Sequence, residues 1–308
     1  MTEFLINWIA ATPSYAAPLL LACLGLIINE RAGVLNLGAE GMMACGALAA
    51  AIVSLTSGWP LLGIIAAMLA GAAMALLFGL VTVYLRANQV ITGLVMVALG
   101  AGLTGALGRD YVSKTLPGFN ALDWGGLAEL PWLGPLLFKQ NSLTYIAFLL
   151  VALVWYVLFK TVLGLRLRAV GEDPATADAA GVNVLLTRLL AVIAGGAFCG
   201  AAGGYLALAS SQIWVEGMIA GRGWIAIGLV IFARWRPALA LLGALLFGAI
   251  EALIPRVQAT GADVPIYFMM MLPYLATLGV LVLVSLRAQR ASAEPASLGV
   301  AYTRQDRH

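Results

Sequence analysis

Long apolar runs separated by short polar segments dominate the chain. A helix needs roughly 20 residues to cross the hydrocarbon core of a membrane, and most of these runs are about that long. The pattern predicts about nine membrane-spanning helices, with eight to ten as the range. They fall at about 14–29, 34–55, 60–85, 89–108, 141–159, 187–210, 221–233, 238–254 and 265–286. The segments 34–55 and 221–233 fit least well, because they are rich in glycine, short, or charged where they begin.

The first residues of the chain are predicted to lie outside the first span. Residues 3–12 form a short apolar stretch that contains Trp8, which suits a position at the membrane interface. No Lys or Arg precedes Arg31, so the positive region of a cleaved signal peptide is missing. We therefore expect the first long apolar run to be retained as a span.

Composition extends this prediction to the whole chain. Of the 308 residues, 62% are hydrophobic and 10% are charged, whereas soluble domains have roughly 45–50% and about 25%. Little room remains for an aqueous domain, so we predict one all-α polytopic membrane bundle over residues 1–308. No basic run is interleaved with aromatics, which argues against a nucleic-acid partner. The three cysteines lie in apolar stretches and the one histidine is His308, so neither a metal site nor a cofactor is predicted.

Basic residues are distributed unequally between the two ends of the predicted helices. Twelve of the 17 Lys and Arg residues fall at one end and five at the other. Because cytoplasmic loops carry an excess of Lys and Arg, the loop 161–188 and the tail 287–308 are predicted to be cytoplasmic. The loop 109–140 is predicted to face outward, and its content of Pro, Gly and Trp suits an ordered external cap.

Small residues indicate how the helices pack. Gly196, Gly200 and Gly204 stand four apart in the segment GGAFCGAAGG, a spacing that lets two helix backbones approach closely in lipid. We expect this row to serve packing within the chain, with a dimer contact as the alternative.

The segment NERAGVLNLGAEG, residues 29–41, places polar groups between two apolar runs. Glu30, Asn36 and Glu40 lie close to hydrocarbon, where an unpaired charge is costly. Its glycines permit a broken backbone, which is tolerated at membrane depth only where it lines protein or a water-filled cavity. We interpret the segment as part of a translocation pathway. The alternative is a polar helix end at the cytoplasmic surface.

The segment RANQVITG, residues 86–93, brings a second set of polar side chains to the start of a span. Gln89 and Thr92 share one helix face, and Asn88 precedes them, so the three could bind a polar solute. They could equally cap the helix or bond to a neighbouring one.

The loop 161–188 carries a predicted short helix. Asp173 followed by Pro174 is typical of an N-cap and a first helical position, so a helix is expected over about 174–180. Gly181 is expected to end it. A capped helix with charged flanks on the inner face favours a docking element, with a solvated connector as the alternative.

Missing motifs limit the chemistry of the chain. The three lysines follow Ser113, Phe138 and Phe159, so no phosphate-binding loop of the Gly-Lys-Ser/Thr type is present. Neither a Ser/His/Asp set nor an HExxH motif occurs. The chain is predicted to be no enzyme, and any ATP hydrolysis is assigned to a separate subunit.

Four segments in order resemble the permease subunits of bacterial ABC importers of the branched-chain amino acid and simple sugar group. They are NERAGVLNLGAEGMM, RANQVITGL, GLRLRAVGEDPATADAAGVNV and EGMIAGRGWIAIGLVIFARWRP, and the likeness covers about 14–286. Within that group the chain is most similar to the smaller permease of nucleoside importers of the guanosine or purine nucleoside type.

The resemblance implies a type II importer fold in the bacterial inner membrane. It implies a pathway at an interface with a second, non-identical permease, and adds Trp224 to the pathway candidates. It also implies ABC ATPase subunits and an extracytoplasmic solute-binding protein as partners. The residues expected to couple to the ATPase are Arg166, Arg168, Gly171, Glu172, Asp173, Ala180 and Gly181.

The solute is expected to be a nucleoside, with simple sugars or branched-chain amino acids as the alternatives. A different class, a secondary transporter driven by an ion gradient, would use an intramembrane carboxylate such as Glu30, Glu40 or Glu216. The docking-type loop and the family motifs favour the ABC permease.

Overall fold

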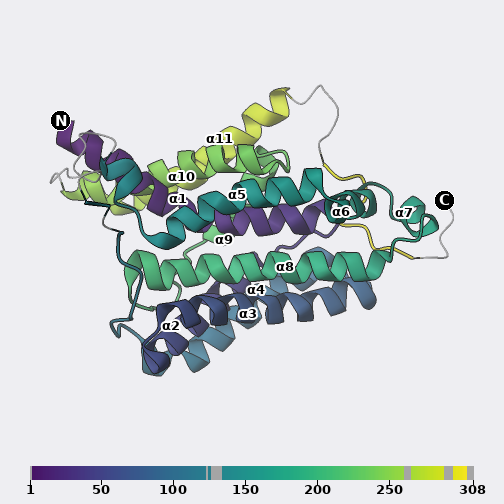
Figure 1. Cartoon of the computed structure of the whole chain (residues 1–308), viewed down its shortest axis with the longest axis horizontal. Coiled ribbons are helices and arrows are strands. Elements are labelled where there is room, and N and C mark those ends of the chain that lie inside the picture. The colour runs from purple at the N-terminus through teal and green to yellow at the C-terminus, as the bar shows by residue number, and fades with distance from the viewer. Residues whose placement is uncertain (1, 123, 126–133, 260–264, 288–293, 304–308) are drawn as a thin grey trace.

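The computed structural model describes residues 2–122, 124–125, 134–259, 265–287 and 294–303. This part of the chain is a bundle of α-helices, which confirms the predicted fold class, and Figure 1 shows most of them running along the long axis. The helices are α1 (Thr2–Arg31), α2 (Ala39–Ser57), α3 (Pro60–Gly79), α4 (Gln89–Leu107), α5 (Ser142–Lys160), α6 (Val162–Glu172), α7 (Pro174–Ala179), α8 (Val184–Tyr205), α9 (Arg222–Phe232), α10 (Pro237–Ala259) and α11 (Ile266–Arg287).

Seven helices in the described residues are long and apolar enough to cross a membrane, namely α1, α2, α3, α4, α5, α8 and α10. The predicted span at 265–286 coincides with the 22-residue helix α11. The predicted span at 221–233 coincides with α9, but the 11 residues of α9 are too few to cross the membrane. A helix of 11 residues rises about 16 Å, roughly half of the hydrocarbon core.

The placement of residues 3–12 outside the first span was also wrong. They belong to α1, a single helix of 30 residues that contains Pro13 and Pro18. Proline is tolerated inside membrane helices where neighbours satisfy the freed backbone groups. Gln140 donates from Nε2 to the carbonyl of Ala10 (2.7 Å), and Trp8 donates from Nε1 to Ala249 (2.7 Å). These contacts hold the first turns of α1 against the bundle.

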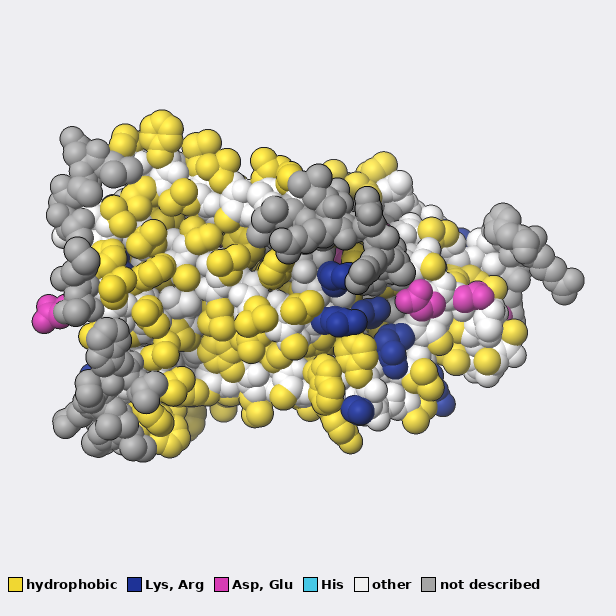
Figure 2. Space-filling model, turned by 90° about the horizontal axis from the view of Figure 1, so that it is seen from above, with side chains coloured by type: hydrophobic (Ala, Val, Ile, Leu, Met, Phe, Trp, Pro, Cys, Tyr) yellow, Lys and Arg dark blue, Asp and Glu magenta, His cyan; other side chains and the backbone are white. Residues whose placement is uncertain are grey.

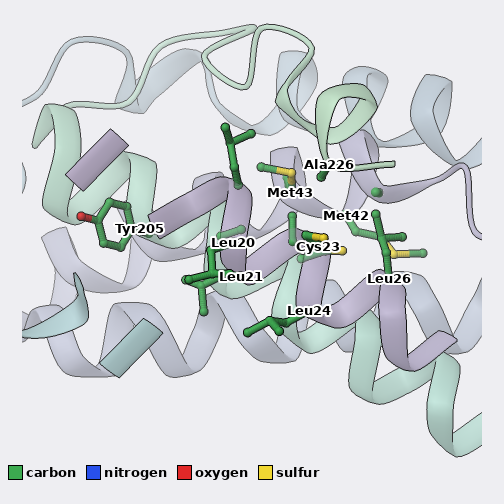
Figure 3. Packing of buried hydrophobic residues seen from close by; sticks show 14 of the residues in the cluster. Leu20, Leu21, Cys23, Leu24, Leu26, Met42, Met43, Tyr205 and Ala226 are labelled. Atoms are coloured by element: carbon green, nitrogen blue, oxygen red, sulfur yellow. The ribbon is translucent and has the colours of Figure 1, made fainter. Parts of the chain in front are cut away.

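Helix α1 forms the centre of the molecule. It packs against α5, α8, α9 and α10, and it is the most deeply buried of the seven candidate spans. Figure 3 shows side chains of α1, among them Leu20, Cys23 and Leu26, pointing into a cluster with Met42 and Met43 of α2. The other helices surround α1 and leave apolar side chains on the outside, as lipid contact requires.

The glycine row of α8 packs within the chain, as expected. In α3, a side chain at Gly196 would collide with Ala75 and the carbonyl of Gly71, one at Gly200 with the carbonyl of Ala67, and one at Gly204 with the side chain of Ala67. Gly203 faces the carbonyl of Met43 in α2. Helices α2, α3 and α8 therefore approach one another at backbone distance.

The two ends of the bundle differ in what they carry. Helices α6 and α7 and the C-terminus lie at one end, and the N-terminus lies at the other (Figure 1). Figure 2 shows hydrophobic side chains over most of one face and Lys and Arg side chains gathered toward the end that carries α6. This is the end predicted to face the cytoplasm.

The opposite end is covered by the described part of the loop 109–140. Ser113, Leu116 and Phe119 donate backbone hydrogen bonds to Trp214, Gln212 and Leu208 (each 2.9 Å). The loop thereby closes over the segment that follows α8. Pro131 and Trp132, on which the prediction of a cap partly rested, lie outside the described residues.

Candidate functional site: a broken helix at the centre of the bundle

The chain leaves helical geometry between α8 and α9. After a π-helical segment, Leu206–Ser211, the backbone turns through Gln212 and reaches α9 only at Arg222. The first N–H groups of a helix have no partner inside it, and they attract negative charge. Glu40 of α2 supplies that charge. Its carboxylate accepts from the N–H of Gly221 (2.8 Å) and of Gly223 (2.7 Å).

An ion pair fixes the same turn from the other side. Arg222 Nε lies 3.1 Å from Glu251 Oε2 of α10, and the two side chains are 22% and 8% exposed. Arg222 also donates from Nη1 to the carbonyls of Met218 (3.3 Å) and Ile219 (3.2 Å). Tyr274 of α11 donates its hydroxyl to the carbonyl of Ala220 (3.1 Å). Three helices thus hold the start of α9.

A cavity of about 180 Å³ opens beside this turn. Residues of α2 and α4 and the segment 214–219 line it, with Glu40, Thr104 and Glu216 as polar groups. Thr104 donates to carbonyls of its own helix, so its hydroxyl oxygen can still accept. The cavity combines apolar walls with a few oxygen acceptors, a lining suited to a neutral solute that carries hydroxyl or N–H groups.

The segment 32–38 between α1 and α2 is the second break in the bundle. Asn36 is fully buried, and its Oδ1 accepts from the N–H of Gly38 (2.9 Å). Gln89 of α4 accepts through Oε1 from the N–H of Leu35 (2.7 Å). Side chains therefore satisfy backbone groups that the helix has released, as irregular backbone inside a membrane requires. We refer to residues 32–38 as the hinge.

The structure brings some of the predicted pathway residues together and separates others. Glu40 lies on the cavity, and Asn36 and Gln89 support the hinge that leads to it. Asn88 instead caps α4 by accepting from the N–H of Ile91 (3.1 Å), and Thr92 donates to the carbonyl of Asn88 (2.8 Å). Asn88 and Thr92 therefore match the alternative prediction, in which they stabilise the start of the helix.

Trp224 and Glu30 also lie away from the cavity lining. Trp224 is 39% exposed on α9. Glu30 is buried near the end of α1, where its Oε2 accepts from Trp235 Nε1 (2.6 Å). Arg31 donates from Nε and Nη2 to the carbonyl of Trp235 (both 3.3 Å). Glu30 and Arg31 therefore meet at Trp235, which follows α9, at the end of the bundle that carries α6.

The predicted docking element has the expected local structure. Asp173 caps α7 by accepting from the N–H groups of Ala175 and Thr176 (both 3.0 Å), and Thr176 also donates its hydroxyl. These bonds lower the pKa of Asp173, and the bond from the Thr176 hydroxyl contributes most. Gly181 follows the helix at φ +85°, a left-handed conformation that glycine adopts without strain.

The predicted coupling residues divide into two groups by exposure. Arg166, Glu172, Asp173, Ala180 and Gly181 are exposed, so a partner can reach them. Arg168 is half-buried, with its guanidinium over the ring of Phe159 (5.1 Å). Gly171 is buried where α6 crosses the end of α1, and a side chain there would collide with the carbonyl of Arg31. Gly171 therefore positions the docking element.

Sequence reasoning missed several functional contacts. It did not single out Arg222, which begins α9 and pairs with Glu251. A carboxylate at position 251 inside an apolar run was a usable signal, because intramembrane charges are rare and paired. Trp235 and Tyr274 carried no such signal, since aromatic residues are ordinary in membrane helices.

Comparison with known proteins gives consistent matches along the chain. A family model described as the permease component of branched-chain amino acid transport systems matches residues 9–281. A candidate glucose ABC transporter permease of Haloferax volcanii, TsgC13, is 46% identical over 261 residues, which cover 83% of this chain and 79% of that protein. The guanosine ABC transporter permease NupQ of Bacillus subtilis is 36% identical, covering 88% and 89%. The nucleoside ABC transporter permease NupC of Lactococcus lactis is 35% identical, covering 87% and 89%.

Proposed function

The chain belongs to the branched-chain amino acid transport permease family, and from this premise we propose that it forms one half of the solute pathway of an ABC importer. It is a multi-pass membrane subunit of the ABC transporter permease class. The other half is a second, non-identical permease. Separate ATPase subunits drive the cycle, and a solute-binding protein delivers the solute from outside.

The break between α8 and α9 is the observation that carries this proposal. Non-helical backbone at membrane depth is tolerated where it lines a cavity, and here it lines one together with Glu40 and Glu216. The hinge forms a second break, immediately before the helix that carries Glu40. A pathway for a polar solute fits this arrangement better than a purely structural bundle does.

The docking element supports the ABC mechanism over an ion-driven one. Helix α7 is capped at Asp173, ends at Gly181 and leaves both residues exposed at the end of the bundle predicted to be cytoplasmic. Two of the three carboxylates that an ion-driven transporter would titrate are already engaged in hydrogen bonds. Glu40 accepts two backbone hydrogen bonds, and Glu30 accepts one from Trp235.

Nucleosides are the proposed solutes. Two relatives that match almost the whole chain are named for guanosine and for nucleosides. The cavity presents oxygen acceptors between apolar walls, which suits the hydroxyl groups of a ribose and the flat face of a base. A sugar is the second candidate, because the relative at 46% identity is named for glucose and a sugar carries similar hydroxyl groups.

Uptake by the native host tests the proposal. Deleting the gene is expected to abolish uptake of labelled guanosine, and restoring the gene is expected to recover it. That uptake should survive a protonophore and stop with orthovanadate, because ATP hydrolysis drives it. Loss of glucose uptake alone would favour the sugar. Uptake that follows a proton or sodium gradient without nucleotide would overturn the ABC mechanism.

A further inference from the structure

The chain returns after α11 to the end of the bundle that carries α6. Residues 294–303, here called the strap, lie across this end as a non-helical segment (Figure 1). Ser297 is its anchor and is only 7% exposed. Its N–H donates to the carbonyl of Gly171 at the end of α6 (3.0 Å), and its Oγ donates to the same carbonyl (2.7 Å). The strap is therefore fastened to the last turn of α6.

Arg188 joins the strap to the hinge. This residue of α8 is 2% exposed, and its guanidinium makes three hydrogen bonds. Nε donates to the carbonyl of Ala32 in the hinge (3.1 Å). Nη1 donates to the carbonyl of Val300 (2.8 Å), and Nη2 donates to Ser297 Oγ (3.0 Å). The planar guanidinium of Arg188 thus links the hinge to the strap, because its hydrogen-bond donors have a fixed geometry.

The strap also touches the hinge and the docking element directly. Gly299 donates its N–H to the carbonyl of Gly33 (3.2 Å). Tyr302 packs against a small apolar cluster of Val170 in α6, Ala177 in α7 and Val184 in α8. The strap is consequently in contact with α6, α7, α8 and the hinge.

We propose that the strap is a positioning element that transmits movement of the docking helix α7 to the hinge, with Ser297 and Arg188 as its positioning residues. This inference rests on the proposed docking of an ATPase on α7. A displacement of α7 moves α6, and α6 pulls on Ser297 through Gly171. Arg188 and Gly299 pass the displacement to residues 32–33, which precede α2 and Glu40. Without the strap, α6 would still touch the end of α1 at Arg31 and Arg188 would still bond Ala32, but the bonds of Ser297 and Gly299 that join α6 to the hinge would be gone.

Ser297→Ala tests the inference in the full importer complex. The variant loses the hydroxyl that bonds Gly171 and Arg188 but keeps the backbone bond to Gly171, so folding and ATPase docking should persist. We expect solute uptake to fall by at least roughly fivefold, the factor that corresponds to the loss of one hydrogen bond, while ATP hydrolysis continues. ATP consumed per solute transported should rise accordingly. Ser57→Ala is the matched control, because the Ser57 hydroxyl donates to the carbonyl of Val53 and accepts from the N–H of Trp59, both nearby in sequence at the far end of the bundle.

Two truncations complete the test. Ending the chain before Glu294 removes the strap, whereas ending it after Thr303 leaves the strap in place. We expect the first truncation to uncouple hydrolysis from uptake more strongly than Ser297→Ala, and the second to behave as the full chain. A synthetic peptide of residues 294–303 should partly restore coupling to the first.

Each result bears on the inference. Wild-type coupling in Ser297→Ala would overturn it, and so would a parallel loss of ATPase binding and uptake, since the strap would then only hold the fold. If the wild-type protein fails to bind an ATPase at all, the proposed function fails first, and that outcome is visible in the co-purification of the unmodified chain.

Discussion

Glu40 shows how a single residue can support a membrane pathway. Both of its carboxylate oxygens accept hydrogen bonds from the backbone at the start of α9, 2.8 and 2.7 Å away. The carboxylate therefore replaces the missing preceding turn of the helix. Glu40 therefore both lines the cavity and caps the start of α9.

Glu40→Ala is expected to destabilise the protein. It would leave two buried N–H groups without acceptors, at a cost of about 1–3 kcal/mol for each. The melting temperature of the detergent-purified protein should fall by several degrees, and Glu40→Gln, which keeps one acceptor oxygen, should fall less. Glu216→Ala is the control, because Glu216 lines the same cavity on an exposed position. Equal stability of the Glu40 and Glu216 alanine variants would contradict the capping role.

Asp173 offers a test that separates a cap from a charge. Asp173→Asn keeps an acceptor oxygen for the N–H groups of Ala175 and Thr176, whereas Asp173→Ala removes it. ATPase co-purification should weaken with Ala and stay near wild type with Asn. An equal loss in both variants would mean that the partner reads the charge and that the cap is incidental.

The lowered pKa of Asp173 sets the pH range of this cap. Because the pKa of the folded state lies below that of the unfolded state, the ionised cap contributes its full stability above the ordinary Asp pKa. That contribution is lost only as the pH falls through the lowered pKa. Near neutral pH, the ionisation of Asp173 should therefore cause no change in ATPase binding by the wild type.

At the scale of elements, the close packing of the helices depends on glycines, which have no side chain. The glycines of α8 let it approach α2 and α3 at backbone distance, and most of their Cβ positions are already occupied by neighbours. Close approach of this kind is what stabilises helix pairs in lipid, where burial of apolar surface gives little net gain.

Gly200→Val should prevent that approach. The new side chain would collide with the backbone of Ala67 and with Gly71 in α3, so the expected loss exceeds the about 1–3 kcal/mol of ordinary overpacking. Membrane levels and the monodisperse peak in fluorescence-detected gel filtration should both drop. Gly102→Val on α4 has no atom within 4 Å of the added Cβ and should leave both unchanged. A stable Gly200→Val protein would show that α3 and α8 pack differently.

The two irregular elements of the bundle, the hinge and the turn before α9, converge on α2. The hinge precedes α2, and Glu40, in the first turn of α2, bonds the backbone just before α9. A movement of α2 would therefore change both the hinge and the cavity. This arrangement gives the inferred strap a physical route from α7 to the pathway.

For the whole molecule, the unequal distribution of basic residues predicts orientation. In a variant lacking the natural cysteines, Ala179→Cys on α7 should be labelled by a membrane-impermeant thiol reagent only from the cytoplasmic side. Asn120→Cys at the opposite end should be labelled only from outside. Both positions are exposed on the chain itself, so in the permease expressed without its partner subunits the membrane alone limits access of the reagent. Labelling of the two from one side, or each from the reverse side, would refute the orientation.

Features that depend only on residues close together in the sequence could be predicted from it. The apolar runs identified a helical membrane bundle because helix length and hydropathy are local properties. The cap at Asp173 and the stop at Gly181 followed from the preferences of a few adjacent residues, and the structure confirms both. The family likewise followed from four short segments in order, and the match over residues 9–281 confirms it.

What only the tertiary structure decided is which distant residues meet. Glu40 and Gly221 are 181 positions apart, Arg188 and Val300 are 112 apart, and nothing in local periodicity joins them. The same limit explains why residues 3–12, which belong to α1, were placed outside the first span, because the bond from Gln140 to Ala10 joins residues 130 positions apart. Where helices present apolar side chains both to lipid and to one another, hydropathy does not distinguish burial in lipid from burial in protein. Packing alone decides which polar group finds which partner.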